Sequence, residues 1–176
     1  EYAKGSPNDV LVRITVANRG PEEASIWVLP TLWFRNTWIW GCRHEGCSLK
    51  PRIEATDALS VTTSHETLGA FVARFGTHPD GDTSRLLFTE NETNTRLLYG
   101  TDNYTPYVKD AFHRFLIDGD EKAVNRERRG TKVAAVHRLR IPAGDQRVVC
   151  ARFCEASERS SACLDDEFCE IFEQRI

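Results

Sequence analysis

Hydrophobic and polar positions alternate along several short segments of the chain. The clearest is DVLVRITVANRGPEE, in which one alternating set is Val10, Val12, Ile14 and Val16 and the other is Leu11, Arg13, Thr15 and Ala17. A two-residue period is typical of a β-strand with one face more buried than the other. The residues NRGPE supply turn chemistry, and a second extended run begins at ASIWVLPTLWF. Together they predict an antiparallel hairpin or meander.

Further strand patterns follow at DALSVTTS, LGAFVARFG, SRLLFTE, TKVAAVHRLRIP and QRVVCARF. Short strands broken by Gly, Pro, Asn and Asp, with few helical patterns between them, favour an antiparallel sheet over a parallel α/β sheet. We therefore predict a mostly β fold, an antiparallel two-layer β-sandwich of the supersandwich type with a C-terminal helix. The predicted sandwich domain covers residues 1–155, and residues 156–176 form a helical tail or linker.

Two segments depart from the strand pattern. PYVKDAFHRFL predicts a short helix or a structured loop. In SSACLDDEFCEIFEQRI, acidic residues precede a stripe of apolar ones, which is typical of an amphipathic helix that Ser160 or Ser161 can cap. The stripe consists of Leu164, Phe168, Ile171 and Phe172. It needs a surface to cover, either the sandwich or a following domain.

Composition limits the classes of function. With 176 residues, 40% of them hydrophobic, the chain is long enough for one domain with a sizeable core. A net charge of −3 provides no basic field for a phosphate backbone, so we expect no nucleic-acid partner. No apolar run has the length of a membrane span, and we expect a cytoplasmic protein without a membrane partner. The chain starts without Met and contains none, which we interpret as a piece of a longer protein.

The six cysteines leave three alternatives open. We predict free thiols, because a core of this size needs no disulfide framework, although such a framework would suit a secreted chain. The segment CRHEGC offers Cys42, His44 and Cys47 as soft ligands but lacks the paired spacing of a structural zinc site. We therefore predict no metal and no cofactor.

The segment LPTLWFRNTWIWG gathers three tryptophans around polar residues. If it continued as a strand, Trp38 and Trp40 would share a face with Asn36, and Trp33 would share the other with Arg35. Aromatic rings would then lie on both faces, so that one face meets the core and the other meets a second layer or a ligand. An aromatic ring covers the apolar face of a sugar, while Arg and Asn hydrogen-bond its hydroxyls. A buried interface with a neighbouring domain is the alternative that we favour.

Two polar clusters are further candidates. In FTENETN, Glu90 and Glu92 would point to opposite faces if the strand continued, which argues against an acid/base pair. We expect these residues and Asn91 to form a loop rich in hydrogen bonds between side chains and the backbone.

The second cluster is YVKDAFH, which contains Lys109, Asp110 and His113. Asp110 and His113 are three residues apart, so the carboxylate can orient the imidazole on a helix. A structural histidine is the alternative that we favour. The chain contains no nucleophile elbow, phosphate-binding glycine loop, HExxH motif or dinucleotide fingerprint, and we assign no catalytic residue.

Five strings carry a resemblance to a known family: VLVRITVANRGPE, LPTLWFRNTWIWG, LLFTENETNTRLLYG, YTPYVKDAFHRFLI and AVNRERRGTKVAA. In this order they resemble the N-terminal β-sandwich region of bacterial proteins similar to glycoside hydrolase family 63, the processing α-glucosidase and mannosylglycerate hydrolase types. The resemblance runs from about Glu1 to Phe153. It implies a sandwich packed against an (α/α)6 barrel, where an acid and a base act in an inverting mechanism.

The barrel is not in this chain, so the resemblance assigns no catalytic carboxylate to any residue here. It implies a non-catalytic domain whose partner is the C-terminal catalytic barrel of the same parent chain. We expect Arg35, Asn36, Trp38, Lys109 and Asp110 at or near the rim of the substrate pocket. The alternative is an autonomous carbohydrate-binding module that uses a surface tryptophan as a stacking platform, with carbohydrate as its ligand.

Overall fold

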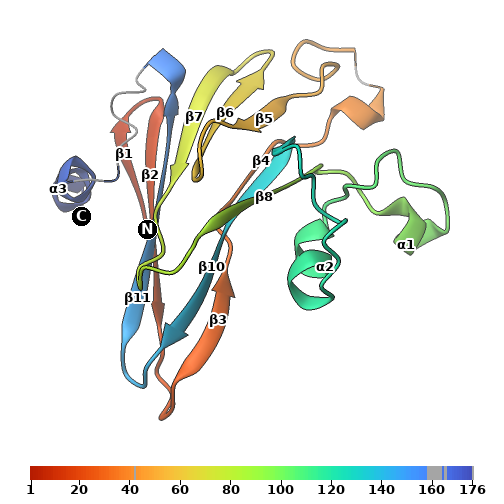
Figure 1. Ribbon diagram of the computed structural model, residues 1–176. Helices are drawn as coiled ribbons and strands as arrows, with labels where there is room; N and C mark the ends of the chain where they lie inside the picture. The colour runs from red at the N-terminus through yellow and green to blue at the C-terminus, as the bar shows by residue number, and fades with distance from the viewer. Residues whose placement is uncertain (42, 158–163, 165, 176) are drawn as a thin grey trace.

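The computed structural model describes residues 1–41, 43–157, 164 and 166–175. Two antiparallel sheets face each other, with helices on their outer sides (Figure 1). The predicted β-sandwich with a C-terminal helix is therefore confirmed. No helix among these residues is long and apolar enough to cross a membrane.

The larger sheet has seven strands in the order β1-β2-β11-β7-β6-β5-β9. Its strands are β1 (Tyr2–Ser6), β2 (Asp9–Ala17), β5 (Arg52–Ala55), β6 (Ser60–His65), β7 (Gly69–Phe75), β9 (Arg129–Gly130) and β11 (Gln146–Glu155). In the smaller sheet, β10 pairs with the other three strands. These strands are β3 (Ala24–Val28), β4 (Thr31–Trp33), β8 (Arg85–Thr89) and β10 (Lys132–Ile141).

The predicted hairpin between the first two extended runs is wrong. β2 pairs with β1 and β11 in the larger sheet, whereas β3 and β4 pair with β10 in the smaller one. The backbone of Asn18 exchanges hydrogen bonds with Gly144 and Asp145 in the turn between β10 and β11, and its side chain donates to Ile141 O. Because Asn18 binds this turn, the chain crosses from one sheet to the other instead of folding back on itself.

The core between the sheets follows the alternation of side chains along β8 and β10. Leu86 and Phe88 of β8 and Val133 and Ala135 of β10 belong to the cluster that meets the larger sheet. The residues between them face outward. Leu87, Ala134 and Val136 pack in a second cluster under the helix α2 (Ala111–Ile117). The outer face of β10 is therefore covered as far as Val136, and α2 confirms the helix predicted for this segment.

The C-terminal helix α3 (Asp166–Arg175) covers the outer face of the larger sheet beside β1 (Figure 1). Phe168 and Phe172 are buried against Ala3 and Leu11. The apolar stripe therefore packs on the sandwich itself. The suggested caps Ser160 and Ser161 lie outside the described residues.

A buried ion pair lies under this helix. Arg152 of β11 donates from Nε and Nη2 to the two carboxylate oxygens of Asp9, at 2.9 and 2.7 Å. Its Nη1 donates to Glu167 of α3 at 3.0 Å. The hydrogen bond with Asp9 raises the pKa of Arg152 above its ordinary value, despite the opposing effect of burial. These contacts fix α3 to the outer face of the sheet.

Candidate functional site

A polar segment begins where β8 ends at Thr89 and runs to the short helix α1 (Thr95–Tyr99). The strand does not continue, so Glu90 and Glu92 do not point to opposite faces as expected. Both carboxylates lie beside the ammonium of Lys50, with Nζ–O distances of 3.2 Å to Glu90 and 2.8 Å to Glu92. Side chains no longer alternate between two faces after Thr89, because pairing of β8 with β10 stops there.

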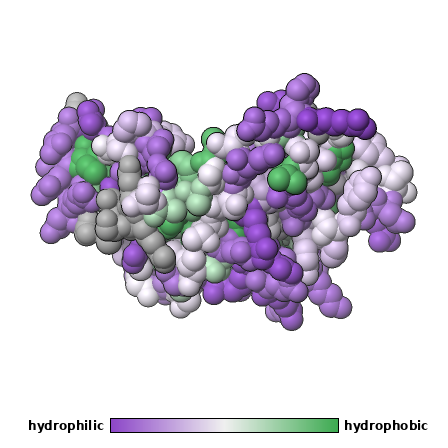
Figure 2. All heavy atoms as spheres, turned by 90° about the horizontal axis from the view of Figure 1, so that it is seen from above, coloured by the Kyte–Doolittle hydropathy of each residue, from purple (hydrophilic) through white to green (hydrophobic). Residues whose placement is uncertain are grey.

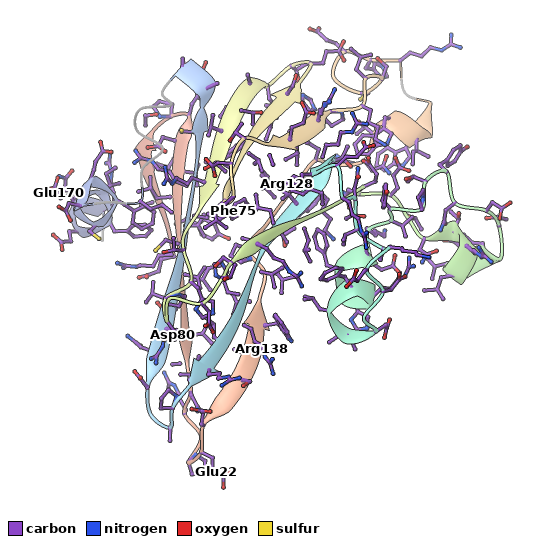
Figure 3. All side chains as sticks on the ribbon, in the orientation of Figure 1. Glu22, Phe75, Asp80, Arg128, Arg138 and Glu170 are labelled. Atoms are coloured by element: carbon purple, nitrogen blue, oxygen red, sulfur yellow. The ribbon has the colours of Figure 1, made fainter. Side chains whose placement is uncertain are left out.

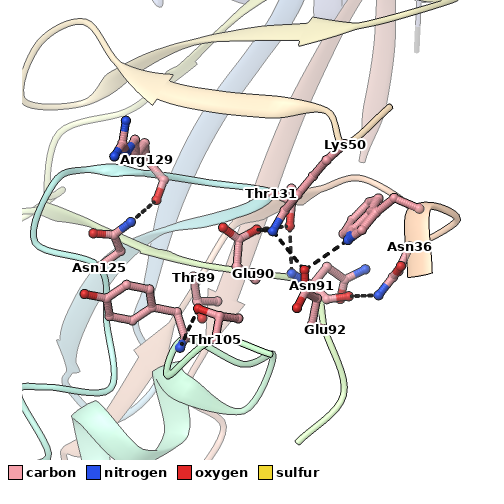
Figure 4. Close-up of polar contacts among 12 residues, drawn as sticks. Asn36, Lys50, Thr89, Glu90, Asn91, Glu92, Thr105, Asn125, Arg129 and Thr131 are labelled. Carbon is pink, nitrogen blue, oxygen red and sulfur yellow. Dashed lines mark hydrogen bonds and ion pairs between the residues drawn. The ribbon is translucent and has the colours of Figure 1, made fainter. Parts of the chain in front are cut away.

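Five residues form what we call the Lys50 cluster: Trp38, Lys50, Glu90, Glu92 and Thr131 (Figure 4). The indole Nε1 of Trp38 donates to Glu92 Oε1 at 3.0 Å. Thr131 Oγ1 donates to Glu90 Oε2 at 2.7 Å and accepts a hydrogen bond from the backbone N of Asn91 at 2.8 Å. Each carboxylate therefore has a charged partner and a neutral one.

The cluster holds its charges in a partly buried setting. The side chain of Glu92 is only 7% exposed, whereas that of Lys50 is 41% exposed. Burial alone would lower the pKa of Lys50, but the hydrogen bond to Glu92 and the nearby carboxylate of Glu90 raise it above its ordinary value. Lys50 therefore stays protonated and compensates the two carboxylates.

A close approach of two backbones positions Thr131. Gly130 of β9 lies against the end of β8, and a Cβ added there would be 2.3 Å from the carbonyl oxygen of Thr89. The backbone N of Thr131 donates to that same carbonyl at 3.1 Å. A glycine at this position lets the chain pass close enough for the Thr131 hydroxyl to reach Glu90.

The aromatic segment is not a continuous strand. β4 ends at Trp33, and Trp38–Trp40 form the 3-10 helix η1. The expected alternation of Trp33, Arg35, Asn36, Trp38 and Trp40 therefore fails. The reason is that the segment bonds to the polar loop after β8 instead of to another strand.

Asn36 and Asn91 make the connection between these two segments. Asn36 Nδ2 donates to Asn91 O at 3.0 Å, and Asn91 Nδ2 donates to Phe34 O at 2.9 Å (Figure 4). The expected loop rich in bonds between side chains and the backbone is confirmed for Asn91, whereas the carboxylates of Glu90 and Glu92 bond to other side chains. The two amides fix the aromatic segment on the Lys50 cluster.

The three tryptophans differ in exposure. Trp38 is partly buried and packs against the core, whereas Trp33 is 54% and Trp40 63% exposed. The guanidinium carbon of Arg35 lies 5.3 Å from the centre of the Trp40 ring, which is cation–π geometry. Other large apolar side chains are exposed on α1 and just after it. Figure 1 shows α1 on the same side of the molecule as the 3-10 helix. We call the whole set the apolar rim: Trp33, Trp40, Leu97, Leu98, Tyr99 and Tyr104.

Lys109 and Asp110 lie beside the cluster, but His113 does not join them. Lys109 N donates to Glu92 O at 2.9 Å, and its Nζ donates to Thr93 Oγ1 at 3.2 Å. Asp110 Oδ2 accepts from Asn94 Nδ2 at 2.9 Å. His113 is exposed on α2, and the Asp110 carboxylate that could have oriented it accepts a hydrogen bond from Asn94 instead.

Two side-chain oxygens at this end of the molecule are buried without a hydrogen-bond partner. They are Asn36 Oδ1 and Asp110 Oδ1. Buried polar atoms are nearly always paired, so these two oxygens are exceptions within the fold. Both belong to residues that the sequence had marked as candidates for a pocket rim.

A cavity of about 410 Å³ opens beside the cluster. Lys50, Glu90 and Thr131 line one part of it, and Tyr107 and Arg129 line another. With Arg52, Thr105 and Glu127, its wall offers three cations, two carboxylates, two threonine hydroxyls and an aromatic ring, which together can bind a polyhydroxylated molecule. A second amine nearby is Lys132, whose pKa is lowered by burial and by the charge of Lys109.

Three members of the site, Lys50, Thr131 and Tyr107, were not indicated by the sequence. Lys50 precedes β5 and Thr131 precedes β10, and neither has a local pattern that distinguishes it from an ordinary surface residue. Only strand pairing brings them to the loop after β8. Glu92 had been noticed only as part of a polar loop.

Among the described residues, no group of three or more His, Cys, Asp or Glu side chains is placed to hold a metal ion. Cys42 and Cys163 lie outside the described residues. Cys150 and Cys169 have free thiols, and burial raises the pKa of Cys150.

Fold and site together define an antiparallel β-sandwich domain with a charged cluster and exposed aromatic residues at one end. No protein-family model matches the chain, and no solved structure matches it. The chain is similar to the uncharacterized protein YMR196W of Saccharomyces cerevisiae, with 31% identity over 197 residues. That alignment covers 97% of this chain but 18% of the yeast protein, so the chain spans about a fifth of its relative's length.

Proposed function

We propose that the chain is a non-catalytic β-sandwich domain of a larger glycoside hydrolase. In this proposal its apolar rim packs against the catalytic barrel of the same parent chain, and the Lys50 cluster borders the substrate pocket. The resemblance of the aromatic and ENETN strings to glycoside hydrolase family 63 suggests the class. The free thiols of Cys150 and Cys169 suit a cytoplasmic parent enzyme.

One observation carries the proposal, namely the exposure of aromatic residues beside a well-ordered polar cluster. Tyr104 is 90% and Trp40 63% exposed. Rings of this size are enriched where two protein surfaces meet, because they bury much apolar area for little conformational entropy.

The yeast relative supports a place within a longer chain. Nearly all of the present chain aligns with a small part of that protein. A segment of this size in a long protein is expected to contact other domains of the same chain.

Substitution in the full-length protein tests the packing. We expect Trp40→Ala and Tyr104→Ala to lower the free energy of unfolding by about 1–3 kcal/mol each, and to lower hydrolysis of α-glucosides or mannosides, because they remove interface rings. Tyr2→Ala is the matched control, since Tyr2 is 79% exposed and belongs to β1 of the larger sheet. Rim variants that melt and hydrolyse like the Tyr2 control would refute the packing.

The alternative function is an autonomous carbohydrate-binding module. The exposed faces of Trp33 and Trp40 favour it, whereas Trp38 is unsuited to stacking because its indole is held by Glu92. Titrating the tryptophan fluorescence of the chain with α-glucosides and mannosides separates the two functions. Saturable quenching that disappears in Trp40→Ala supports the module, and an unchanged spectrum supports the packing domain.

A further inference from the structure

Two arginines lie side by side on the outer face of the smaller sheet, away from the Lys50 cluster. Arg85 of β8 is opposite Val136 of β10, and Arg138 is two residues further along β10 and opposite Trp27 of β3. Val136 faces outward, toward α2. Residues two apart on a strand point to the same face, so Arg138 faces outward as well (Figure 3). Like charges at neighbouring sheet positions repel each other.

Each guanidinium lies over an aromatic ring. The distance from the guanidinium carbon to the ring centre is 4.5 Å for Arg85 over Phe115 and 5.5 Å for Arg138 over Trp27. Stacking occupies the flat face of a guanidinium and leaves its N–H edge available for planar, bidentate recognition. Within the described part of the chain, neither arginine forms an ion pair with a carboxylate.

The two arginines line a common cavity of about 380 Å³. Trp27 and Thr83 contribute an aromatic wall and a hydroxyl, and Asp82 contributes one carboxylate. Two cations against one anion leave the cavity with a net positive charge.

Neighbouring contacts fix the position of the pocket on the sheet. The buried ring of His78 places Nε2 3.0 Å from the carbonyl oxygen of Arg138, while His78 Nδ1 accepts a hydrogen bond from Asp80 N. The backbone that carries Arg138 is therefore bonded to the segment after β7 as well as to its strand neighbours. A positive pocket on a rigid support is suited to hold a compact anion.

We propose that this pocket binds a small phosphorylated molecule, with the phosphate held between Arg85 and Arg138. A phosphate monoester matches two outward-facing guanidinium edges better than a single carboxylate does, because it presents three acceptor oxygens and up to two negative charges. The remaining volume, bordered by Trp27 and Thr83, accommodates an organic group such as a hexose. This proposal is independent of the function proposed above.

Titration of the chain with inorganic phosphate and with glucose 6-phosphate, at constant ionic strength, tests the site. We expect saturable binding of both by calorimetry, with a change in tryptophan fluorescence, and no binding of glucose. Arg85→Ala and Arg138→Ala are expected to weaken binding at least about tenfold, since each removes charge-assisted hydrogen bonds. Arg138→Lys keeps the charge but loses the bidentate edge, and should bind more weakly than the unchanged chain.

Arg140→Ala is the matched control. Arg140 is two residues beyond Arg138 on the same face, is exposed, and lies opposite Ser25 rather than in the cavity. Its variant should bind like the unchanged chain, and thermal melting verifies that all variants are folded. Absence of saturable binding would overturn the proposal, as would equal weakening in Arg140→Ala, which would indicate only a general effect of positive charge.

Discussion

At the scale of single residues, the candidate site depends on Lys50. Its ammonium is the cation that contacts both Glu90 and Glu92, and Glu92 is almost completely buried. A buried carboxylate that loses its charged partner keeps the full cost of desolvation. The polar end of the sandwich therefore owes its order to a lysine that lies 40 residues before Glu90 in the sequence.

Replacing this lysine tests its role. We expect Lys50→Met to lower the free energy of unfolding by about 1–3 kcal/mol, a smaller loss than for a fully buried pair because Lys50 is partly exposed. Urea denaturation measures the change. Lys122→Met is the control at an exposed position and should change stability by less than about 0.5 kcal/mol. Equal stability of the two variants would contradict the role given to Lys50.

The sequence could not have predicted this site in full. Asn36, Asn91, Lys109 and Asp110 were found because they stand beside aromatic or polar strings. The geometry that joins them to Lys50 and Thr131 depends on strand pairing between distant segments, which a local pattern does not contain.

At the scale of elements, apolar patterns predicted most strands and the two longer helices. The strands β2, β3, β4, β6, β7, β8, β10 and β11 were expected from alternation or extended apolar runs, and α2 and α3 from apolar spacing. The strands β1, β5 and β9 and the helix α1 were missed, since their segments have too little periodicity.

Pairing was harder to predict than the strands themselves. The turn residues after β2 suggested a hairpin, but Asn18 binds the turn between β10 and β11 and directs the chain into the other sheet. Tertiary contacts therefore overrode a local turn signal.

The inner face of β10 also carries a histidine that links stability to pH. His137 is fully buried, with Nδ1 3.0 Å from Ser84 Oγ and Nε2 without a hydrogen-bond partner. Burial, assisted by the charge of His78, lowers the pKa of His137 to about 4. The folded chain therefore binds this proton less readily than the unfolded chain, whose histidine has a pKa near 6.5.

Stability should consequently fall as the pH drops below about 6.5, because the unfolded state takes up the proton first. We expect a loss of about 1–2 kcal/mol between pH 7 and pH 5 from this residue. Urea denaturation across this range measures it, with His137→Gln expected to reduce the slope and the exposed His113→Gln expected to leave it unchanged. If the free energy of unfolding of His137→Gln falls just as steeply with pH, another residue causes the pH dependence.

At the scale of the whole molecule, four layers lie side by side: α3, the seven-stranded sheet, the smaller sheet and α2 (Figure 1). Seen from above, the surface is largely hydrophilic, with hydrophobic residues in small separate areas (Figure 2). The apolar rim and the Lys50 cluster are therefore local features of one end, carried by loops and short helices on a rigid sandwich. This division suits a domain whose core is self-contained and whose end contacts another part of a longer protein.

The most direct test of this account is hydroxyl-radical footprinting of the isolated chain and of the full-length protein. We predict that Trp33, Trp40 and Tyr104 are oxidised rapidly in the isolated chain and are protected at least about fivefold in the full-length protein, because another domain covers them. Tyr2, which is also exposed, should be oxidised at the same rate in both. Equal oxidation of the rim in the two proteins would contradict the proposed packing and leave the aromatic end as a surface for ligands.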